Sequence, residues 1–276
     1  MPPPNFGKLK NPSCPMSDAD NRPEGPSFVF IGPPGVGKTV FFTCAVDRLK
    51  RDLLEVPGIS LQTDDQVTLK RHAKSLADMK KGSWPAKSAE PVKLFYELEI
   101  TRTLFGIRLW SNFTKLVYHD YPGEVFDLAF GDDRHDSPFE SEAETLKEDL
   151  LQAQGIFLVI DTPFLHDGAN DDYNEQLFCL LKFLESGHPK RRVAVIFTKK
   201  DMFRGDPDFN PKDQLRDYYP DAWVFLERSN ANYFFVSAVS DPILNRSGKP
   251  VPPKGYDTSM SENLIEPLRW ALNLSV

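Results

Sequence analysis

The sequence has little that would support a disulfide framework, a zinc site or a membrane span. Its three cysteines, Cys14, Cys44 and Cys179, are an odd number and show no CxxC spacing. The longest apolar runs, such as GIFLVI, are far too short to cross a bilayer, and no signal peptide is visible. These absences predict a cytoplasmic protein with free cysteines.

An excess of positive charge is also lacking. Lys and Arg number 33 against 40 Asp and Glu, which gives a formal net charge of −7. This balance argues against binding to bulk nucleic acid or to an anionic membrane surface. The histidines show no metal-ligand spacing with one another, and the acidic loop at 132–136 lacks the further ligands that a calcium site needs.

The length and composition predict one domain. With 276 residues and 40% hydrophobic side chains, the chain can bury one substantial core. Residues 1–26 are rich in proline and polar residues and nearly free of large apolar ones, so we expect a disordered leader there. Residues 27–276 are predicted to form a single domain with an insertion at about 56–91.

The insertion is predicted to contain one helix. Leu69, Ala73 and Leu76 recur on one helical face, and Gly82 follows as a stop signal. The basic side chains of this helix are interpreted as solvated surface. The insertion is a candidate partner surface.

Short apolar runs alternate with helical periodicities along the rest of the chain. VKLFYELEI (92–100) and KLVYHD (115–120) predict an antiparallel hairpin joined near Gly106. Ser141 and Glu144 predict a capping box at the start of a helix. The other strands are uniformly apolar: FVFI, GIFLVID, VAVIFT and YFFV. The predicted fold class is therefore α/β, a three-layer P-loop domain whose sheet is mostly parallel with one antiparallel strand.

The clearest motif is a phosphate-binding loop after the first strand. The pattern GxxxxGK[ST] is met by GPPGVGKT and lies between a strand and a helical pattern. Lys38 would reach the β- and γ-phosphates, and the Thr39 hydroxyl would hold Mg²⁺. The nucleotide-binding residues predicted here are Gly32, Pro33, Pro34, Gly35, Val36, Gly37, Lys38, Thr39 and Val40. The loop alone does not distinguish an ATPase or a nucleotide kinase from a GTPase.

Polar residues directly after later strands address the metal and the phosphates. In sheets of this kind, ligands bind beyond the carboxyl ends of strands. Asp120 to Gly123 form a DxxG motif after KLVYHD. Asp120 can hold Mg²⁺ through water, and the backbone N–H of Gly123 can reach a γ-phosphate.

Two further motifs address the base. Thr198 to Asp201 form TKKD after VAVIFT, and Ser237-Ala238 follow YFFV. The Asp201 carboxylate can accept guanine N1–H and N2–H, while the Lys199 stem stacks over the base. Adenine offers no such match, and sites built on polar matching discriminate strongly. The small Ser237-Ala238 pair allows backbone N–H groups close to guanine O6.

The motifs GPPGVGKT, DYPG, TKKD and SA, in this order and each after a strand, resemble those of Ras-like P-loop GTPases of the TRAFAC class. The resemblance covers roughly 27–276. GSWPAKS, DYPGEVF and IEPLRWAL are further similar to the bacterial double-GTPase group. The resemblance implies a Mg²⁺-dependent switch that hydrolyses GTP to GDP and acts on a protein effector or regulator. The same resemblance implies catalytic roles for Lys38, Gly123 and Glu124.

The sequence departs from the Ras-like pattern at the switch I position. Ras-like proteins carry a threonine there that touches Mg²⁺, and its place is taken here by Ser88, with Thr63 and Thr68 as alternatives. Ser88 is therefore the third predicted metal ligand, beside Thr39 and Asp120.

It also departs at the catalytic positions. Ras itself has a glutamine where this chain has Glu124, so Glu124 is hypothesised to position the attacking water. Hydrolysis is then slow or needs a partner. Arg71, Arg102 and Arg134 are interpreted as surface residues, so none is assigned as an arginine finger in cis.

Two other functions stay open at this point. The first is a GTP- or GDP-binding interaction module with little hydrolysis. The second is an AAA+-type ATPase, which would need an apolar strand ending in Asp-Glu and a helical lid. Neither FLVID nor LVYHD is followed by that glutamate, which disfavours it.

Overall fold

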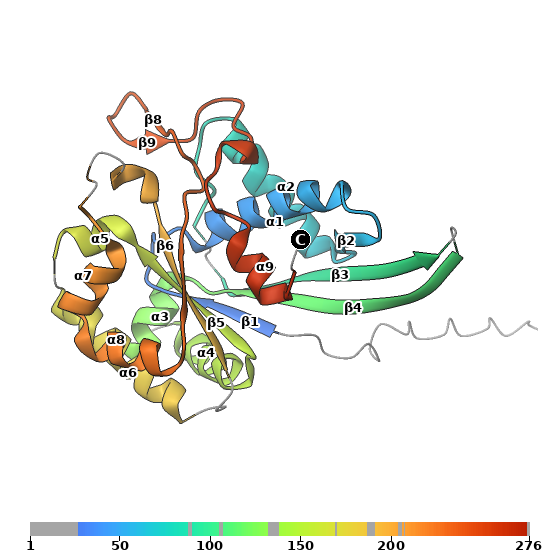
Figure 1. The fold of residues 1–276 in the computed structure, drawn as a ribbon. Helices are drawn as coiled ribbons and strands as arrows, with labels where there is room; N and C mark the ends of the chain where they lie inside the picture. The colour runs from blue at the N-terminus through green and yellow to red at the C-terminus, as the bar shows by residue number, and fades with distance from the viewer. Residues whose placement is uncertain are drawn as a thin grey trace, which may run out of the picture.

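The structure of this chain is a computed structural model that describes residues 27–87, 90–104, 107–131, 138–168, 170–186, 191–203, 206 and 208–274. The predicted leader at 1–26 lies outside these residues. A seven-stranded sheet in the order β2-β3-β4-β1-β5-β6-β7 forms the centre of the fold (Figure 1). Its strands are β1 (Ser27–Ile31), β2 (Ile59–Gln62), β3 (Val92–Leu104), β4 (Ile107–Asp120), β5 (Gly155–Asp161), β6 (Arg192–Thr198) and β7 (Asn232–Phe235).

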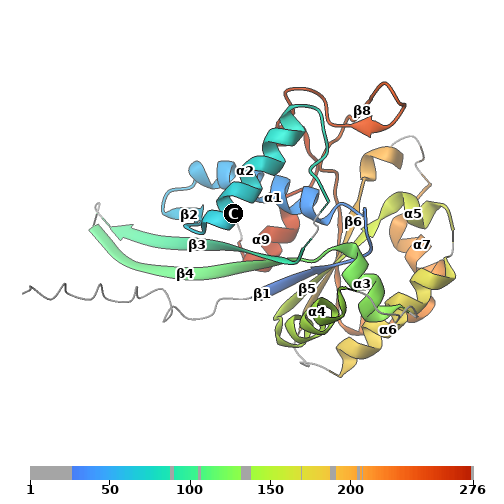
Figure 2. The same ribbon diagram turned by 180° about the vertical axis from the view of Figure 1, so that it is seen from behind.

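The sheet confirms the predicted fold class. Strands β4, β1, β5, β6 and β7 pair in parallel, and β3 runs antiparallel to both of its neighbours, β2 and β4. The two strands of the predicted hairpin are confirmed as the antiparallel β3–β4 pair, which extends beyond the rest of the sheet (Figures 1 and 2). The predicted turn at Gly106 lies outside the described residues. Strand β2 is an addition from the insertion that the sequence did not predict.

Helices cover both faces of the sheet. Alternate side chains of β1 point to opposite faces: Phe28 and Phe30 join one buried cluster, and Val29 and Ile31 join the other. The first cluster lies under α1 (Lys38–Leu54), α2 (Gln66–Lys80) and α9 (Glu266–Leu272). The second lies under α3 (Gly123–Phe130), α4 (Glu140–Gln152), α5 (Thr162–His166), α6 (Asp171–Glu185), α7 (Pro211–Tyr218) and α8 (Pro220–Arg228). Among the described helices, none combines the length and apolar character needed to cross a membrane.

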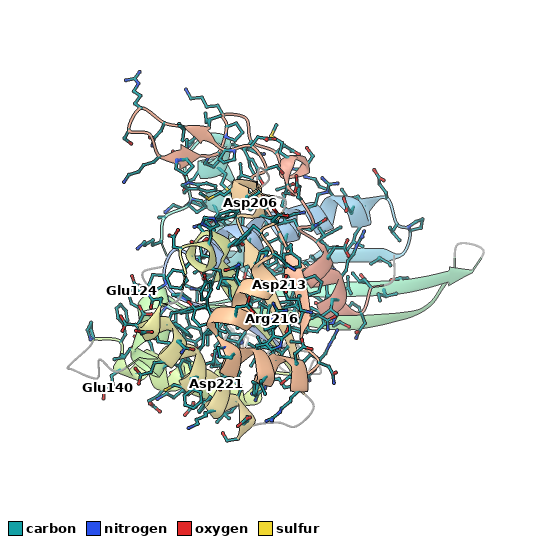
Figure 3. All side chains as sticks on the ribbon, turned by 60° about the vertical axis from the view of Figure 1, so that its left-hand side comes forward. Glu124, Glu140, Asp206, Asp213, Arg216 and Asp221 are labelled. Carbon is teal, nitrogen blue, oxygen red and sulfur yellow. The ribbon has the colours of Figure 1, made fainter. Side chains whose placement is uncertain are left out.

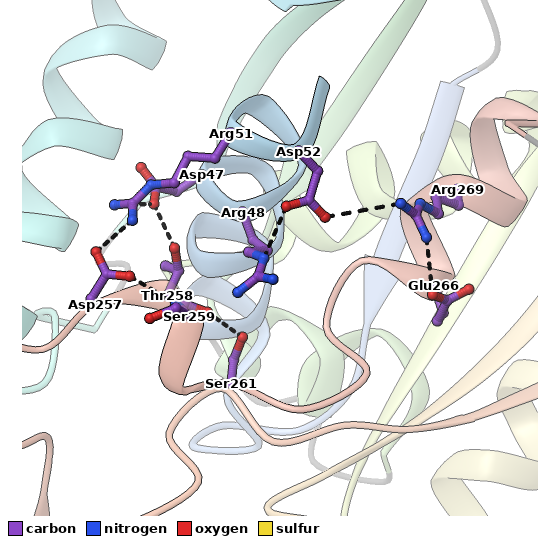
Figure 4. A network of polar contacts seen from close by, with 10 residues as sticks. All are labelled: Asp47, Arg48, Arg51, Asp52, Asp257, Thr258, Ser259, Ser261, Glu266 and Arg269. Atoms are coloured by element: carbon purple, nitrogen blue, oxygen red, sulfur yellow. Dashed lines mark hydrogen bonds and ion pairs between the residues drawn. The ribbon is translucent and has the colours of Figure 1, made fainter. Parts of the chain in front are cut away.

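Polar contacts fix α1 against the C-terminal segment (Figure 4). Arg51 forms ion pairs with Asp47 at 2.9 Å and with Asp257 at 2.5 Å, and the Thr258 hydroxyl donates to Asp47 at 2.7 Å. Arg269 of α9 lies 3.9 Å from Asp52. Since α1 begins in the phosphate loop, these contacts connect the end of the chain to the helix that carries that loop.

The helix predicted in the insertion is confirmed as α2, but its apolar positions Leu69 and Ala73 lie on the exposed side. In α2 the buried side chains are Thr68, Ser75 and Met79, whereas Leu69 is exposed. The buried face is mixed: Met79 joins the core cluster under α1, and the other contacts are hydrogen bonds and an ion pair with distant residues. Hydrophobic periodicity cannot reveal such a face.

The predicted capping box is also wrong. Ser141 lies within α4, and the N-cap residue is Phe139, which makes no side-chain capping hydrogen bond. The Ser–Glu spacing matches a capping box, but it is equally compatible with the first turn of a helix.

His72 is expected to make the fold less stable in acid. Burial and the nearby positive charge of Lys50 lower the pKa of His72 to about 4, although the carboxylate of Asp47 acts in the opposite direction. The neutral ring shares a hydrogen bond with the Tyr96 hydroxyl at 3.0 Å. Because the folded pKa lies below the ordinary 6.5, the unfolded chain binds the proton more readily. Stability present above pH 6.5 is therefore lost as the pH falls toward 4.

The expected loss from this residue between pH 7 and pH 5 is about 2 kcal/mol. Urea unfolding at both pH values, in wild type and His72→Gln, measures it: the pH-dependent loss should be smaller in the variant by about that amount. An equal loss in both proteins contradicts the prediction.

Candidate functional site

One cavity of about 970 Å³ opens at the carboxyl ends of the parallel strands. The predicted site residues that line it are Pro34, Gly35, Val36, Gly37, Lys38, Thr39, Val40, Asp120, Gly123, Glu124, Thr198, Lys199, Asp201 and Ala238. They follow β1, β4, β6 and β7, so residues distant in sequence meet at one edge of the sheet. Gly32, Pro33 and Ser237 do not line the cavity, although Ser237 contacts Asp201. Ser88 lies outside the described residues.

The phosphate loop has the backbone geometry that its glycines predict. Gly35 and Gly37 have φ values of 80° and 93°, a region that side-chain-bearing residues rarely adopt. The ammonium of Lys38 donates to the carbonyls of Gly32 at 2.6 Å and Pro33 at 3.1 Å. Burial lowers the pKa of Lys38 to about 8. The start of α1 and this ammonium together make a site suited to an anion.

The predicted metal ligands join α1 to the end of β4. The Thr39 hydroxyl lies 3.1 and 3.3 Å from the two carboxylate oxygens of Asp120, and the Tyr118 hydroxyl donates to Asp120 at 2.9 Å. Asp120 is only 1% exposed. A hydroxyl and a carboxylate are the hard oxygen ligands that Mg²⁺ prefers, and Mg²⁺ commonly takes its other ligands from phosphates and water. These residues therefore fit the predicted ion.

Arg71, interpreted from the sequence as a surface residue, is partly exposed but also forms an ion pair with a residue of the site. Its Nη2 atom lies 2.7 Å from Oδ2 of Asp120. The alternatives to Ser88 are held at the start of α2 and do not line the cavity: the Thr68 hydroxyl donates to Asp65 at 2.6 Å, and Thr63 accepts from the Asp65 N–H at 3.2 Å.

The two motifs predicted to read the base meet in space. The Ser237 hydroxyl donates to Oδ1 of Asp201, which orients that carboxylate. Thr198 of the same motif donates to the carbonyl of Val36 at 2.8 Å, so it ties TKKD to the phosphate loop. The two halves of the site are thereby held in a fixed relation.

Asp161 is a residue of the site that the sequence prediction missed. It ends β5, and its Oδ2 atom accepts a hydrogen bond from Lys199 Nζ at 2.6 Å. Lys199 has a φ of 60°, which is unusual for a residue with a side chain. The only available signal was the position of Asp161 at the carboxyl end of a strand, where ligands bind in such sheets.

A roof over the cavity was also not predicted. The indole N–H of Trp84 donates to the carbonyl of Pro250 at 2.8 Å. This bond joins the segment 83–87 to the hairpin of β8 (Ile243–Leu244) and β9 (Pro250–Val251). The roof residues that line the cavity are Trp84, Pro85, Ala86, Lys87, Pro242, Leu244 and Pro250.

The DYPG segment is fixed between the phosphate loop and α4. Gly123 approaches the loop so closely that an added Cβ would lie 2.2 Å from the backbone nitrogen of Pro34. The Tyr121 hydroxyl donates to Asp149 of α4, which also bonds His119 at 2.7 Å and Lys93 at 2.9 Å. Burial would raise the pKa of Asp149, but these hydrogen bonds lower it to about 2.

The next residue, Glu124, is exposed at the start of α3 (Figure 3) and lines the cavity. Its side chain is therefore within reach of solvent and of a ligand in the cavity.

Comparison with known proteins finds likeness in structure only. No protein family and no curated protein matches the chain. The signal recognition particle receptor SRb-GTP/SRX complex from Chaetomium thermophilum is 18% identical, with a TM-score of 0.43, over 79% of this chain and 92% of that one. The S. cerevisiae Ski7 GTPase-like domain, bound to GTP, is 14% identical, with a TM-score of 0.45, over 91% of this chain and 50% of that one.

The bacterial selenocysteine-specific elongation factor EF-Sec is 14% identical, with a TM-score of 0.39, over 91% of this chain and 28% of that one. The chain thus spans half or less of the Ski7 and EF-Sec structures. At these identities and TM-scores the likenesses carry no weight for ligand or activity, which depend on the geometry of the site.

Proposed function

We propose that residues 27–276 are a Ras-like P-loop GTPase domain that binds guanine nucleotide with Mg²⁺ and hydrolyses GTP to GDP and phosphate. The observation that carries the proposal is a single cavity lined by the phosphate loop, the Thr39–Asp120 pair and Asp201, whose carboxylate is oriented by Ser237. In this proposal the domain is a nucleotide-dependent switch for a partner protein in the cytoplasm. The finer similarity to the double-GTPase group, and Ser88 as the third metal ligand, belong to the same proposal.

Each half of the cavity has a role in the proposed binding. The ammonium of Lys38 exchanges the carbonyls of Gly32 and Pro33 for phosphate oxygens. Asp201 accepts the two N–H groups of guanine, and the Lys199 stem, fixed at its end by Asp161, lies over the base. Adenine would leave the Asp201 carboxylate unmatched, which is the basis of the expected selectivity.

Catalysis in this proposal is positioning and charge stabilisation. Bound Mg²⁺ would neutralise charge that develops on the β- and γ-phosphates. Lys38 adds a second positive charge, and the backbone N–H of Gly123 donates to the γ-phosphate. Glu124, exposed at the cavity, accepts a hydrogen bond from the attacking water.

A second candidate is a guanine-nucleotide-binding module with little hydrolysis. Two observations favour it. Gly123 packs closely on Pro34, which leaves little room for a γ-phosphate between them, and the residue at position 124 is an exposed carboxylate. A carboxylate adds negative charge near the phosphate. This candidate shares the binding chemistry and differs only in turnover.

Competition binding tests the proposal. Purified protein is titrated with a fluorescent GDP analogue, which is then displaced with GDP, ADP or XDP. We expect GDP to compete better than ADP by orders of magnitude, because only guanine matches Asp201. Equal competition by ADP would overturn the guanine assignment. Single-turnover GTP hydrolysis, with and without cell extract, then separates the two candidates.

Glu124→Ala is expected to lower the single-turnover rate of GTP hydrolysis by about 10- to 100-fold, because the attacking water loses its acceptor. Binding of GDP should stay unchanged, since Glu124 follows Gly123, which is proposed to contact the γ-phosphate that GDP lacks. Glu124→Gln is the matched variant: it keeps the hydrogen bond and removes the charge, so it should hydrolyse at least as fast as wild type. An unchanged rate in Glu124→Ala removes the proposed role.

A further inference from the structure

Helix α2 is held on the domain in two ways: Met79, near its end, is fully buried in the core cluster under α1, and the earlier turns make polar contacts. The Thr68 hydroxyl accepts a hydrogen bond from the Phe95 N–H of β3 at 3.0 Å, and His72 bonds Tyr96 of the same strand. Val67 and Leu69 are instead 56% and 39% exposed. Hydrogen bonds contribute modestly to stability in net terms. The docked position of the first turns of α2 therefore depends on a few polar contacts, of which the Arg71 ion pair is the one that reaches the site.

Arg71 shares its carboxylate with the metal half of the site. Its guanidinium lies 2.7 Å from Oδ2 of Asp120, and the Thr39 hydroxyl lies within 3.3 Å of both oxygens of the same group. A cation held between Thr39 and Asp120 would therefore lie beside the guanidinium. Two positive charges at that separation repel each other, and more strongly in a buried site than in water.

We propose that Arg71 and Mg²⁺ compete for Asp120, so that binding of the metal with nucleotide loosens α2 from the sheet. The inference rests on the metal half of the proposed function and assigns a regulatory role to the insertion helix. By linkage the effect is reciprocal: if bound Mg²⁺ weakens the docking of α2, then docked α2 lowers the affinity for Mg²⁺ by the same factor.

The end of α2 carries this change to the roof of the cavity. The carbonyl of Lys80 accepts a hydrogen bond from the Gly255 N–H at 2.8 Å, and the Ser83 N–H donates to the carbonyl of Asp78 at 3.0 Å. The next residue, Trp84, bonds Pro250. A displacement of α2 would therefore pull on both sides of the roof. Binding of the metal would thereby change the position of the roof residues.

The first experiment measures the Mg²⁺ concentration that half-saturates protein loaded with fluorescent GDP. Arg71→Ala should need about tenfold less Mg²⁺ than wild type, within the usual range of coupling between sites. Arg71→Lys keeps the charge and should stay nearer to wild type. Lys74→Ala, an exposed residue of the same helix, is the matched control and should not change. An unchanged or higher Mg²⁺ requirement in Arg71→Ala overturns the competition.

Hydrogen exchange of α2 is the reciprocal measurement. In wild type, Mg²⁺ should raise amide exchange in residues 66–80. In Arg71→Ala that exchange should already be raised and should no longer respond to Mg²⁺. Protection of α2 by Mg²⁺ in wild type would overturn the proposal.

Failure of this inference can be distinguished from failure of the proposed function. If GDP binds but neither measurement responds to Arg71, only the inference fails. If no guanine nucleotide binds, the proposed function fails. The exchange experiment with MgCl₂ and without nucleotide, against NaCl at equal ionic strength, then still tests the competition at Asp120.

Discussion

Asp201→Asn is expected to weaken binding of GDP by about 10⁴-fold and to improve binding of XDP, its xanthine counterpart. The wild-type carboxylate accepts both N1–H and N2–H of guanine. An asparagine amide accepts one of them and presents N–H groups to the other, which leaves donors facing each other. Xanthine carries a carbonyl in place of the amino group, so the same amide matches it. Direct titration with fluorescent GDP and fluorescent XDP measures both changes in one protein.

Two variants separate base recognition from general damage to this region. Ser237→Ala removes the hydroxyl that donates to Asp201 and should weaken GDP binding by about tenfold, with no gain for XDP. Lys200→Ala changes the neighbouring residue, whose ammonium lies 4.0 Å from Glu262, and should leave both affinities unchanged. If Asp201→Asn binds GDP as wild type does, Asp201 does not contact the base.

The features that could be predicted from the sequence are those encoded in short local spacings. The eight residues from Gly32 to Thr39 predict the phosphate loop by themselves, because the glycines at 35 and 37 permit its left-handed backbone. The uniformly apolar strands predict burial on both faces, and the polar residue after each strand must then lie at the carboxyl edge of the sheet. The sheet and the meeting of Asp201 with Ser237 follow from these rules.

The features that could not be predicted depend on partners far away in the chain. The polar part of the buried face of α2 depends on Asp120, Tyr96 and the Phe95 N–H, which come from strands distant in the sequence. Periodicity instead favoured the exposed face with Leu69 and Ala73. The bonds between Lys199 and Asp161 and between Trp84 and Pro250 are likewise tertiary contacts that leave no spacing in the sequence.

A structural consequence of this division is that the geometry of binding and the proposed means of control come from different parts of the chain. The elements that line the phosphate and base ends are strand-terminal loops fixed by buried side chains such as Thr198. The insertion adds a helix whose Arg71 pairs with Asp120, the carboxylate that Thr39 of the phosphate loop also contacts. In the proposed control, α2 and the roof move while the loops at the phosphate and base ends stay in place.

Gly123→Ala is expected to abolish hydrolysis while sparing GDP binding. The new Cβ would lie 2.2 Å from the backbone nitrogen of Pro34 and 2.3 Å from its Cα, and backbone atoms cannot turn away as a side chain can. The start of α3 must therefore move off the phosphate loop, and the Gly123 N–H moves with it. Loss of one such donor costs about 100- to 1000-fold in rate, and the overpacking costs about 1–3 kcal/mol in stability.

Single-turnover hydrolysis, GDP titration and thermal unfolding measure these three effects separately. GDP affinity should stay within about threefold of wild type, because loop and base contacts come from other elements. Gly131→Ala is the matched steric control. Its Cβ would lie 2.5 Å from the Asp127 carbonyl, at the end of α3 opposite to Gly123 and the phosphate loop. That variant should lose stability and keep its rate. Wild-type hydrolysis in Gly123→Ala, or equal loss of rate in both variants, would show that the contact between Gly123 and Pro34 has no special role in the reaction.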